Sequence, residues 1–275
     1  MLRWLAAAAV LLAVPAPAQG GALDDYAPLV VHAEGEPDPL TSVRAFAGRV
    51  PGVEPGRARP VVYGRRFGQW LQYWMLFANN SQDRGLLRTG RHEGDWEMIQ
   101  LRIRRGRPVQ AVYAQHSGAE SCGFRWASRG GRRPVVFLAR GSHASYFVPG
   151  LRDRMWPDPN DVADGDGLRV RPRVVRITES RPAWMRYRGR WGDTRAGWVP
   201  GEMDSPRGPA FQPKGRWTNP EGWAAAARRC TREDCDRRGE CDGAETAVAA
   251  ALAVLGFLGA LLFGVRRMRR VEAVH

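Results

Sequence analysis

Short runs of β-forming residues, each interrupted by Gly, Pro, Asn or Asp, most constrain what this chain can fold into. Between its two ends no long stretch shows the apolar period of a helix, and the chain contains 20 Pro and 32 Gly. This spacing is typical of a β-sandwich or barrel. We predict a mainly β domain, a β-sandwich, with strands at "PVVYG", "FGQWLQYWMLFANN", "WEMIQLRIRR", "PVQAVYAQH", "RPVVFLARG" and "LRVRPRVVRIT", and short helices at "TSVRAFAG" and "EGWAAAARR".

The two ends of the chain carry apolar segments of different kinds. The first residues combine an early arginine, an apolar run and an A-x-A sequence at Ala16 and Ala18, which predicts a secretory signal peptide. No charged residue occurs from Ala247 to Val265, a run of about 19 residues that roughly matches the ~30 Å hydrocarbon core of a bilayer. Four arginines follow directly and mark the cytoplasmic side.

These signals predict one topology. The expected parts are a signal peptide at 1–18, a β-sandwich ectodomain at 19–230, a stalk at 231–243, one transmembrane helix at 244–265 and a cytoplasmic tail at 266–275. The protein is therefore expected in the plasma membrane as a single-pass protein, with its N-terminal body outside and its C-terminal tail in the cytoplasm.

The charge of the chain is strongly positive, at +14, and Lys214 is the only lysine among its 42 basic residues. Nucleic-acid binding is not expected, because the arginines are scattered and the body is predicted to be exported. Attraction to anionic lipid or to a cell-wall polymer is a better use of the charge. The alternative is a solvated basic surface without a specific partner.

The chain has four cysteines, Cys122, Cys230, Cys235 and Cys241. An even number in an exported protein predicts disulfides, and three connectivities are open. We expect one cysteine of the C-terminal group to pair with Cys122. A zinc site is the disfavoured alternative, because the chain has no C-x2-C pair with a nearby histidine.

The stretch "HEGDWEMIQLRI" places titratable groups where a strand begins. Residues two apart in a strand share a face, so Asp95 and Glu97 should point the same way as Ile99, toward the core. Unpaired carboxylates there would be costly. His92 lies just before the strand, and Gly94 gives the backbone freedom to bend it inward.

Two further histidines follow, each at the end of a predicted strand: His116 lies 24 residues after His92, and His143 lies 27 residues after His116. Convergence of these ends at one rim of the sheet predicts a divalent-cation site. Carboxylates favour calcium or magnesium, and imidazoles admit zinc or manganese. The alternative is that the carboxylates pair with arginines or loop amides and the histidines are turn residues. The expected metal ligands are His92, Asp95, Glu97, His116 and His143.

A second acidic stretch, "WPDPNDVADGDGLRV", contains Asp158, Asp161, Asp164 and Asp166. It lacks the spacing of an EF-hand, so we predict an Asx-rich turn. A calcium loop is the alternative, and the stretch could also lend an oxygen to the main site.

The body resembles the vacuolar protein sorting-associated protein 62 family, which has no assigned biochemical activity. The resemblance covers about Asp24 to Trp223, and "HEGDWE" and "GSHASY" are its most specific motifs. "HEGDWE" is also similar, more loosely, to the GHRHDWE hallmark of the necrosis- and ethylene-inducing toxins. That resemblance implies a β-sandwich and places His92, Asp95 and Glu97 on a cation, although Gly94 replaces the second histidine of the hallmark.

Three functions are consistent with these features. The favoured one is a surface-anchored, metal-dependent domain that binds a glycan, a lipid head group or a wall polymer, with the 11 tryptophans offering apolar faces. The second is a metal-dependent hydrolase, phosphoesterase-like, with His116 or His143 as acid or base. No HExxH or other catalytic signature supports it. The third is a structural ectodomain.

Overall fold

A computed structural model describes residues 21–82, 90–154, 158–193 and 203–230 of the chain. The predicted signal peptide, stalk, transmembrane helix and cytoplasmic tail all lie outside these ranges. Within the described ranges, no helix combines the length and apolarity needed to cross a membrane.

The prediction of a mainly β fold is confirmed, and the predicted helices at 41–48 and 221–229 correspond to η1 and α2. The elements are α1 (Gly21–Asp25), β1 (Leu29–Val31), η1 (Val43–Phe46), β2 (Val61–Phe67), β3 (Trp70–Asn80), β4 (His92–Arg104), β5 (Arg107–Gln115), β6 (Gly118–Gly123), η3 (Phe124–Trp126), β7 (Arg129–Gly130), β8 (Arg133–Leu138), β9 (Ser145–Tyr146), β10 (Gly150–Arg152), β11 (Asp161–Ala163), β12 (Arg169–Val170), β13 (Arg173–Arg176), η4 (Ala183–Arg186), η5 (Pro209–Phe211), α2 (Pro220–Ala226) and β14 (Arg228–Arg229).

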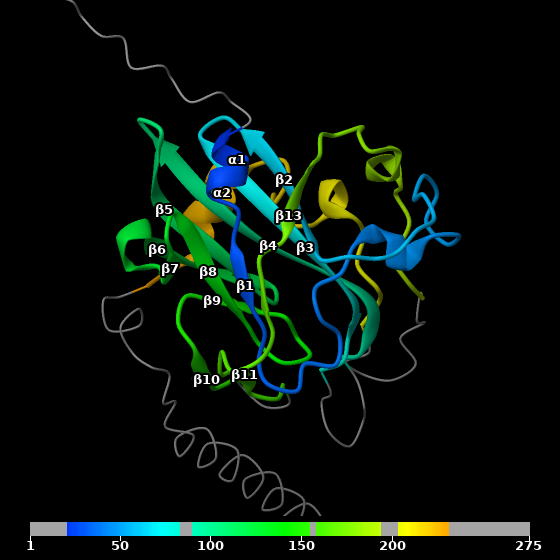
Figure 1. The fold of residues 1–275 in the computed structure, drawn as a ribbon, viewed down its shortest axis with the longest axis horizontal. Helices are drawn as coiled ribbons and strands as arrows, with labels where there is room; N and C mark the ends of the chain where they lie inside the picture. Colours follow the sequence, from blue (N-terminus) through cyan, green and yellow to red (C-terminus); the bar gives the residue numbers. More distant parts are fainter. Residues whose placement is uncertain (1–20, 83–89, 155–157, 194–202, 231–275) are drawn as a thin grey trace, which may run out of the picture.

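The strands form two open sheets and a separate pair (Figure 1). Seven strands make the larger sheet, in the order β13-β2-β3-β4-β5-β6-β14, and five make the smaller one, in the order β12-β1-β8-β7 with β9 paired to β8. β10 and β11 pair only with each other in the described part of the chain. The long antiparallel strands β3 and β4 hold the centre of the larger sheet.

The first core lies between the two sheets. It joins Tyr73 of β3 and Ile99 of β4 to Val136 and Leu138 of β8, all at most 1% exposed. Alternation along each strand produces this shared apolar layer, because every second side chain faces the smaller sheet.

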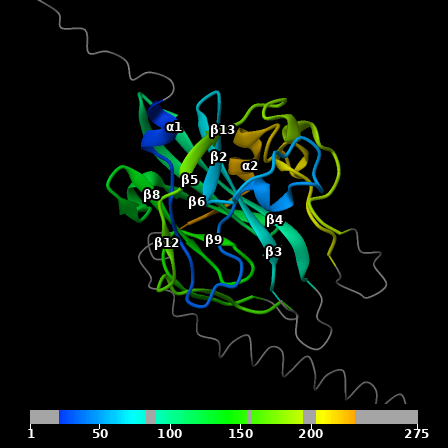
Figure 2. The same cartoon turned by 45° about the vertical axis from the view of Figure 1, so that its right-hand side comes forward.

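The second core covers the opposite face of the larger sheet. Short helices and loops, rather than another sheet, lie over that face (Figure 2). The packing is aromatic, and the indoles of Trp96, Trp184 and Trp191 contact one another. Seven tryptophans are buried in this core: Trp70, Trp74, Trp96, Trp184, Trp191, Trp217 and Trp223.

The expected disulfide to Cys122 is present, and its partner is Cys230, with 5.2 Å between the two Cα atoms. The bond ties the end of β14 to β6, beside a hydrogen bond from the Cys230 amide to the Ser121 carbonyl. Cys235 and Cys241 lie outside the described residues.

Candidate functional site

The beginning of β4 carries two buried carboxylates. Asp95 pairs with Phe77 of β3 and Glu97 with Met75, so both carboxylates lie on the face of the first core. Asp95 is 6% exposed and Glu97 is 5% exposed. The predicted orientation of this motif is therefore correct.

Glu97 is the least compensated of these groups. Its Oε2 atom is buried without a hydrogen-bond partner in the described part of the protein. Burial raises the pKa of the Glu97 carboxyl well above its usual range, and the neighbouring charge of Asp95 raises it further. A proton or a cation would relieve this cost.

His143 lies between two carboxylates. Its Nδ1 is 2.9 Å from Oδ2 of Asp95 and its Nε2 is 3.3 Å from Oε1 of Glu36. The ring stacks on Phe77, with 3.8 Å between the ring centroids. Burial alone would lower the pKa of His143, but the hydrogen bonds and charges of Asp95 and Glu36 raise it to about 9. His143 is therefore an imidazolium at neutral pH and donates from both nitrogens.

Glu36 lies in the loop after β1 and makes the second of these two carboxylate contacts with His143. Burial is the largest single influence and opposes its ionisation, but the hydrogen bond and charge of His143 and the amides of Gly141 and Asp38 together lower the pKa of the Glu36 carboxyl. The amide of Gly141 also donates to Glu36, at 2.7 Å. The sequence signal for Glu36 is weak, because it lies 107 residues from His143 in an ordinary Pro-rich loop.

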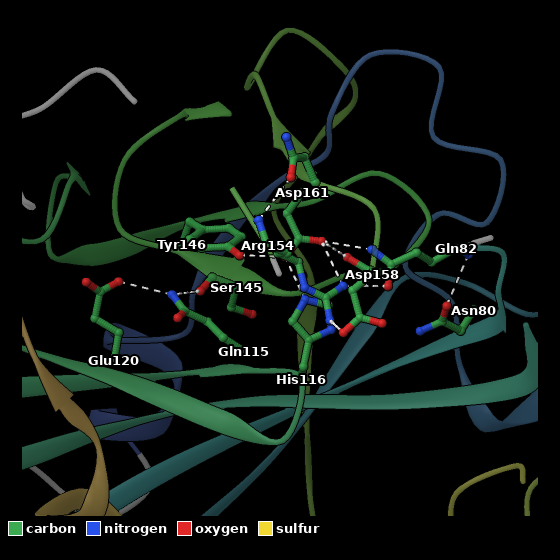
Figure 3. Close-up of polar contacts among 12 residues, drawn as sticks. Asn80, Gln82, Gln115, His116, Glu120, Ser145, Tyr146, Arg154, Asp158 and Asp161 are labelled. Atoms are coloured by element: carbon green, nitrogen blue, oxygen red, sulfur yellow. Dashed lines mark hydrogen bonds and ion pairs between the residues drawn. The ribbon is translucent and has the colours of Figure 1, made fainter. Parts of the chain in front are cut away.

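His116 contacts a different carboxylate, that of Asp161 in β11 (Figure 3). The distance from His116 Nε2 to Asp161 Oδ2 is 2.6 Å. The same carboxylate accepts hydrogen bonds from Ser142, Tyr146 and Gln82, at 2.7, 2.6 and 3.1 Å. Burial would raise the pKa of Asp161, but its bond to His116 and the other donors lower it.

The two networks adjoin in the turn between β8 and β9, because Ser142 and His143 are neighbours in the chain. The pKa of Glu97 responds to charges on both sides, those of Asp95, His143 and Asp161. We call the whole set the acid–imidazole cluster; its members are Glu36, Asp95, Glu97, His116, His143 and Asp161.

Both cluster histidines have left-handed backbone conformations. φ is 52° at His116 and 56° at His143, a region that non-glycine residues seldom adopt. His116 is the first of two residues that link the paired ends of β5 and β6, Gln115 and Gly118, a position where primed turns usually carry glycine. Strained residues of this kind are concentrated at functional sites.

His92 is buried but shares no hydrogen bond with the cluster among the described residues. Its Nδ1 lies 2.8 Å from the Gly94 carbonyl, which can only accept, so Nδ1 donates in this contact. Gly94 has a φ of 64°, and a Cβ there would clash with the Trp191 carbonyl. The expected backbone bend at Gly94 is thus present.

The structure brings the predicted ligands together only in part. Asp95, Glu97 and His143 are neighbours, His116 joins them through Asp161, and His92 is bonded separately. Across the described ranges, no group of three or more His, Cys, Asp or Glu side chains is placed to hold a metal ion. Asp161, predicted to lie in an Asx-rich turn that could lend an oxygen, has more hydrogen-bond partners than any other member of the cluster in the described part of the chain. Asp164 behaves as an Asx-turn residue, accepting from the amide of Asp166.

A pocket of about 350 Å³ adjoins the cluster. Gln82 and Gly141 form part of its wall, and they bond to Asp161 and Glu36 respectively. Arg91 and Arg140 contribute positive charge to the same wall. The pocket therefore reaches the buried cluster through two residues that contact both.

These features define an open, two-sheet β protein with a buried acid–imidazole cluster at one rim. Residues 80–157, which contain most of that cluster, match the family model described as Vacuolar protein sorting-associated protein 62. The family resemblance of the sequence is thereby confirmed.

Two curated relatives come from Saccharomyces cerevisiae. The Vacuolar protein sorting-associated protein 62 is 27% identical over 167 residues, and the Putative vacuolar protein sorting-associated protein TDA6 is 28% identical over 172 residues. Each match covers 45% of this chain and spans only 36% of the relative's length.

Solved structures of the toxin family are also similar. "NLPPya in complex with glucosamine" has a TM-score of 0.40 and 12% identity, and covers 78% of this chain and 92% of its own. The Necrosis and Ethylene inducing Protein 2 from the causal agent of cocoa's Witches Broom disease has a TM-score of 0.34 and 14% identity, over 61% and 76% of the two chains. These TM-scores are too low to compare the sites.

Proposed function

We propose that this chain is a membrane-anchored, extracytoplasmic binding domain in which a divalent cation lies at the acid–imidazole cluster. Its ligand would be a glycan, a lipid head group or a wall polymer. The observation that carries the proposal is Glu97, whose buried Oε2 has no hydrogen-bond partner in the described ranges while Asp95 lies beside it on the same face. A buried carboxylate pair of this kind requires a positive charge or a proton.

The sequence predicts five equivalent metal ligands. We propose instead that these residues have two different roles. Among the described residues, Oε2 of Glu97 has no hydrogen-bond partner and His92 uses Nδ1 in its contact with Gly94, so these two and Asp95 fit a cation. His143 and His116 already bond to carboxylates, and they fit the role of orienting those carboxylates. Side-chain rotation must complete the site, because the described side chains do not yet form one.

The donor chemistry favours calcium or magnesium. Asp95 and Glu97 supply carboxylate oxygens, which both ions prefer. Binding through His92 as well would favour zinc or manganese instead. When bound, the cation would neutralise the two carboxylates and supply a positive charge close to the pocket lined by Gln82 and Gly141.

Anchoring in the plasma membrane is part of the proposal. Its support is the uncharged run from Ala247 to Val265 followed by four arginines, together with the signal-peptide pattern before residue 19. Protease added to intact cells should remove the body and leave the C-terminal tail protected. Protection of the body would contradict this orientation.

The test of the cation uses the full chain in a neutral detergent. We expect elemental analysis to find a divalent metal, and chelator to lower the melting temperature. Asp95→Asn and Glu97→Gln should lose the metal and the response to chelator. Glu93→Gln is the matched control, because Glu93 lies in the same strand but pairs with Arg49. A metal-free protein that is indifferent to chelator would refute the cation site.

A hydrolase is the second candidate, and the His116–Asp161 pair favours it. The His116 side chain is 24% exposed and a fully buried carboxylate orients it, as in the pairs that position a general base. A phosphoester screen with wild type and His116→Gln tests this candidate. Turnover that disappears in His116→Gln but persists in His32→Gln would favour the enzyme over the binding domain.

A further inference from the structure

A second polar pocket, of about 460 Å³, opens on the opposite face of the larger sheet from Asp95 and Glu97. Four arginines line it against a single acidic residue, Glu54. Val61 and Tyr63 of β2 form part of its wall, and both belong to the second core. We call it the arginine pocket; its basic residues are Arg44, Arg57, Arg59 and Arg173.

The four guanidinium groups outnumber the acidic charge of the pocket, which comes from Glu54. None of them forms an ion pair or a side-chain hydrogen bond with any residue in the described ranges. Other exposed arginines do pair, as Arg49 does with Glu93 and Arg176 with Asp24. Four basic groups gathered around one acid attract an external anion.

The pocket is built on a rigid base. Tyr63 is 2% exposed, and its ring packs edge-on against Trp184 at 5.1 Å between centroids. The Tyr63 hydroxyl accepts the Val43 amide hydrogen at 2.8 Å, which fixes the start of η1 beside it. Ser42, also buried, accepts the Arg59 amide at 3.4 Å and so holds the loop that carries Arg57 and Arg59.

The arginines enter from three separate segments. Arg44 belongs to η1, Arg57 and Arg59 belong to the loop before β2, and Arg173 opens the edge strand β13, opposite Val61. Gly56 leaves room for the Arg44 side chain, since a Cβ at that position would collide with its Nη1. This convergence suits a compact group with several oxygens and at least two negative charges.

We propose that the arginine pocket binds a phosphate-bearing group, either free diphosphate or the phosphate of a lipid head group. Guanidinium forks match phosphate oxygens in bidentate pairs, and an arginine-only set suits phosphate better than a single carboxylate. The pocket needs no cation, so this binding is independent of the proposed function and of Glu97.

The experiment is calorimetric titration of the full chain, in neutral detergent with EDTA and 150 mM NaCl, a salt level that screens unspecific attraction beyond about 8 Å. The probes are inorganic pyrophosphate and short-chain dihexanoyl phosphatidate. We expect Arg57→Gln/Arg59→Gln to weaken binding by about tenfold or more, because two charge-assisted contacts are lost. Arg173→Gln, on another wall, should weaken it by a smaller factor.

The matched control is Arg104→Gln/Arg107→Gln, which removes the same charge from two exposed arginines paired across the β4–β5 hairpin. Its affinity should stay within about twofold of wild type, as should that of Glu97→Gln, because screened charges outside the pocket contribute little. The tighter of the two probes identifies the source of the phosphate. No binding of either probe at millimolar concentration, or an equal loss in the control, would overturn the proposal.

Discussion

His32 and His143 are both fully buried, and both pack against the ring of Phe77. They nevertheless differ in charge, because His32 is neutral and His143 is positive at neutral pH. Burial, followed by the positive charge of His143, lowers the pKa of His32 to about 4, whereas two carboxylates raise that of His143 to about 9. Within the part of the chain that the structure describes, His32 accepts one hydrogen bond, from the Leu40 amide to its Nε2. Partners rather than burial decide which of two neighbouring imidazoles carries a charge.

The largest effect should come from removing the charged member of the pair. His143→Gln leaves Asp95 and Glu36 buried without their cation, and we expect a loss of about 3–5 kcal/mol in the free energy of unfolding. His32→Gln keeps an acceptor for the Leu40 amide and should cost about 1 kcal/mol. Urea unfolding followed by tryptophan fluorescence measures both. Equal losses would break the comparison.

The pH dependence should separate the two histidines. Because the folded pKa of His32 is lowered, the unfolded chain takes up a proton first as pH falls. Stability should therefore drop between pH 6.5 and about 4, by up to about 3 kcal/mol. His143 has a raised pKa, so its contribution is complete below pH 6.5 and is lost as pH rises through about 9.

The variants assign each part of this profile. His32→Gln should flatten the fall on the acid side, and His143→Gln should flatten the fall on the alkaline side. Stability curves measured from pH 4 to pH 10 for the three proteins provide the check. An acid side unchanged in His32→Gln would show that His32 is not neutral in the fold.

The smallest expected effect concerns Glu97. It tests whether partners rather than burial also decide the energetic cost of a buried carboxylate. In EDTA, Glu97→Gln removes a buried acid whose Oε2 has no hydrogen-bond partner among the described residues, and should raise the free energy of unfolding by about 1 kcal/mol. Asp161→Asn should lower it instead, because Asp161 accepts from His116, Ser142, Tyr146 and Gln82. Thermal melts of both variants test the signs, and a loss of stability in Glu97→Gln would contradict the account of Glu97.

The local part of the site could be predicted from the sequence. Strand alternation places Asp95 and Glu97 on the core side, and Gly94 supplies the bend before them, as the register with Phe77 and Met75 shows. These features depend on residues within a few positions of one another, and a short motif records them.

The pairing of the histidines could not be predicted in the same way. His143 reaches Glu36, 107 residues away, and His116 reaches Asp161, 45 residues away, each from a turn with positive φ. The spacing of the two histidines indicates that their turns can approach one rim of the sheet. It does not indicate which carboxylate each imidazole contacts. The tryptophans show the same limit, since seven of the 11 are buried in the second core, which the sequence pattern did not indicate.

The link between Cys122 and Cys230 has a mechanical consequence. A force applied to the chain beyond Cys230 is transmitted through the disulfide directly to β6, and not through α2 and β14. The segment between the two cysteines therefore cannot be extended by that force. Tension from that side would be carried by the larger sheet and would not separate its edge strand.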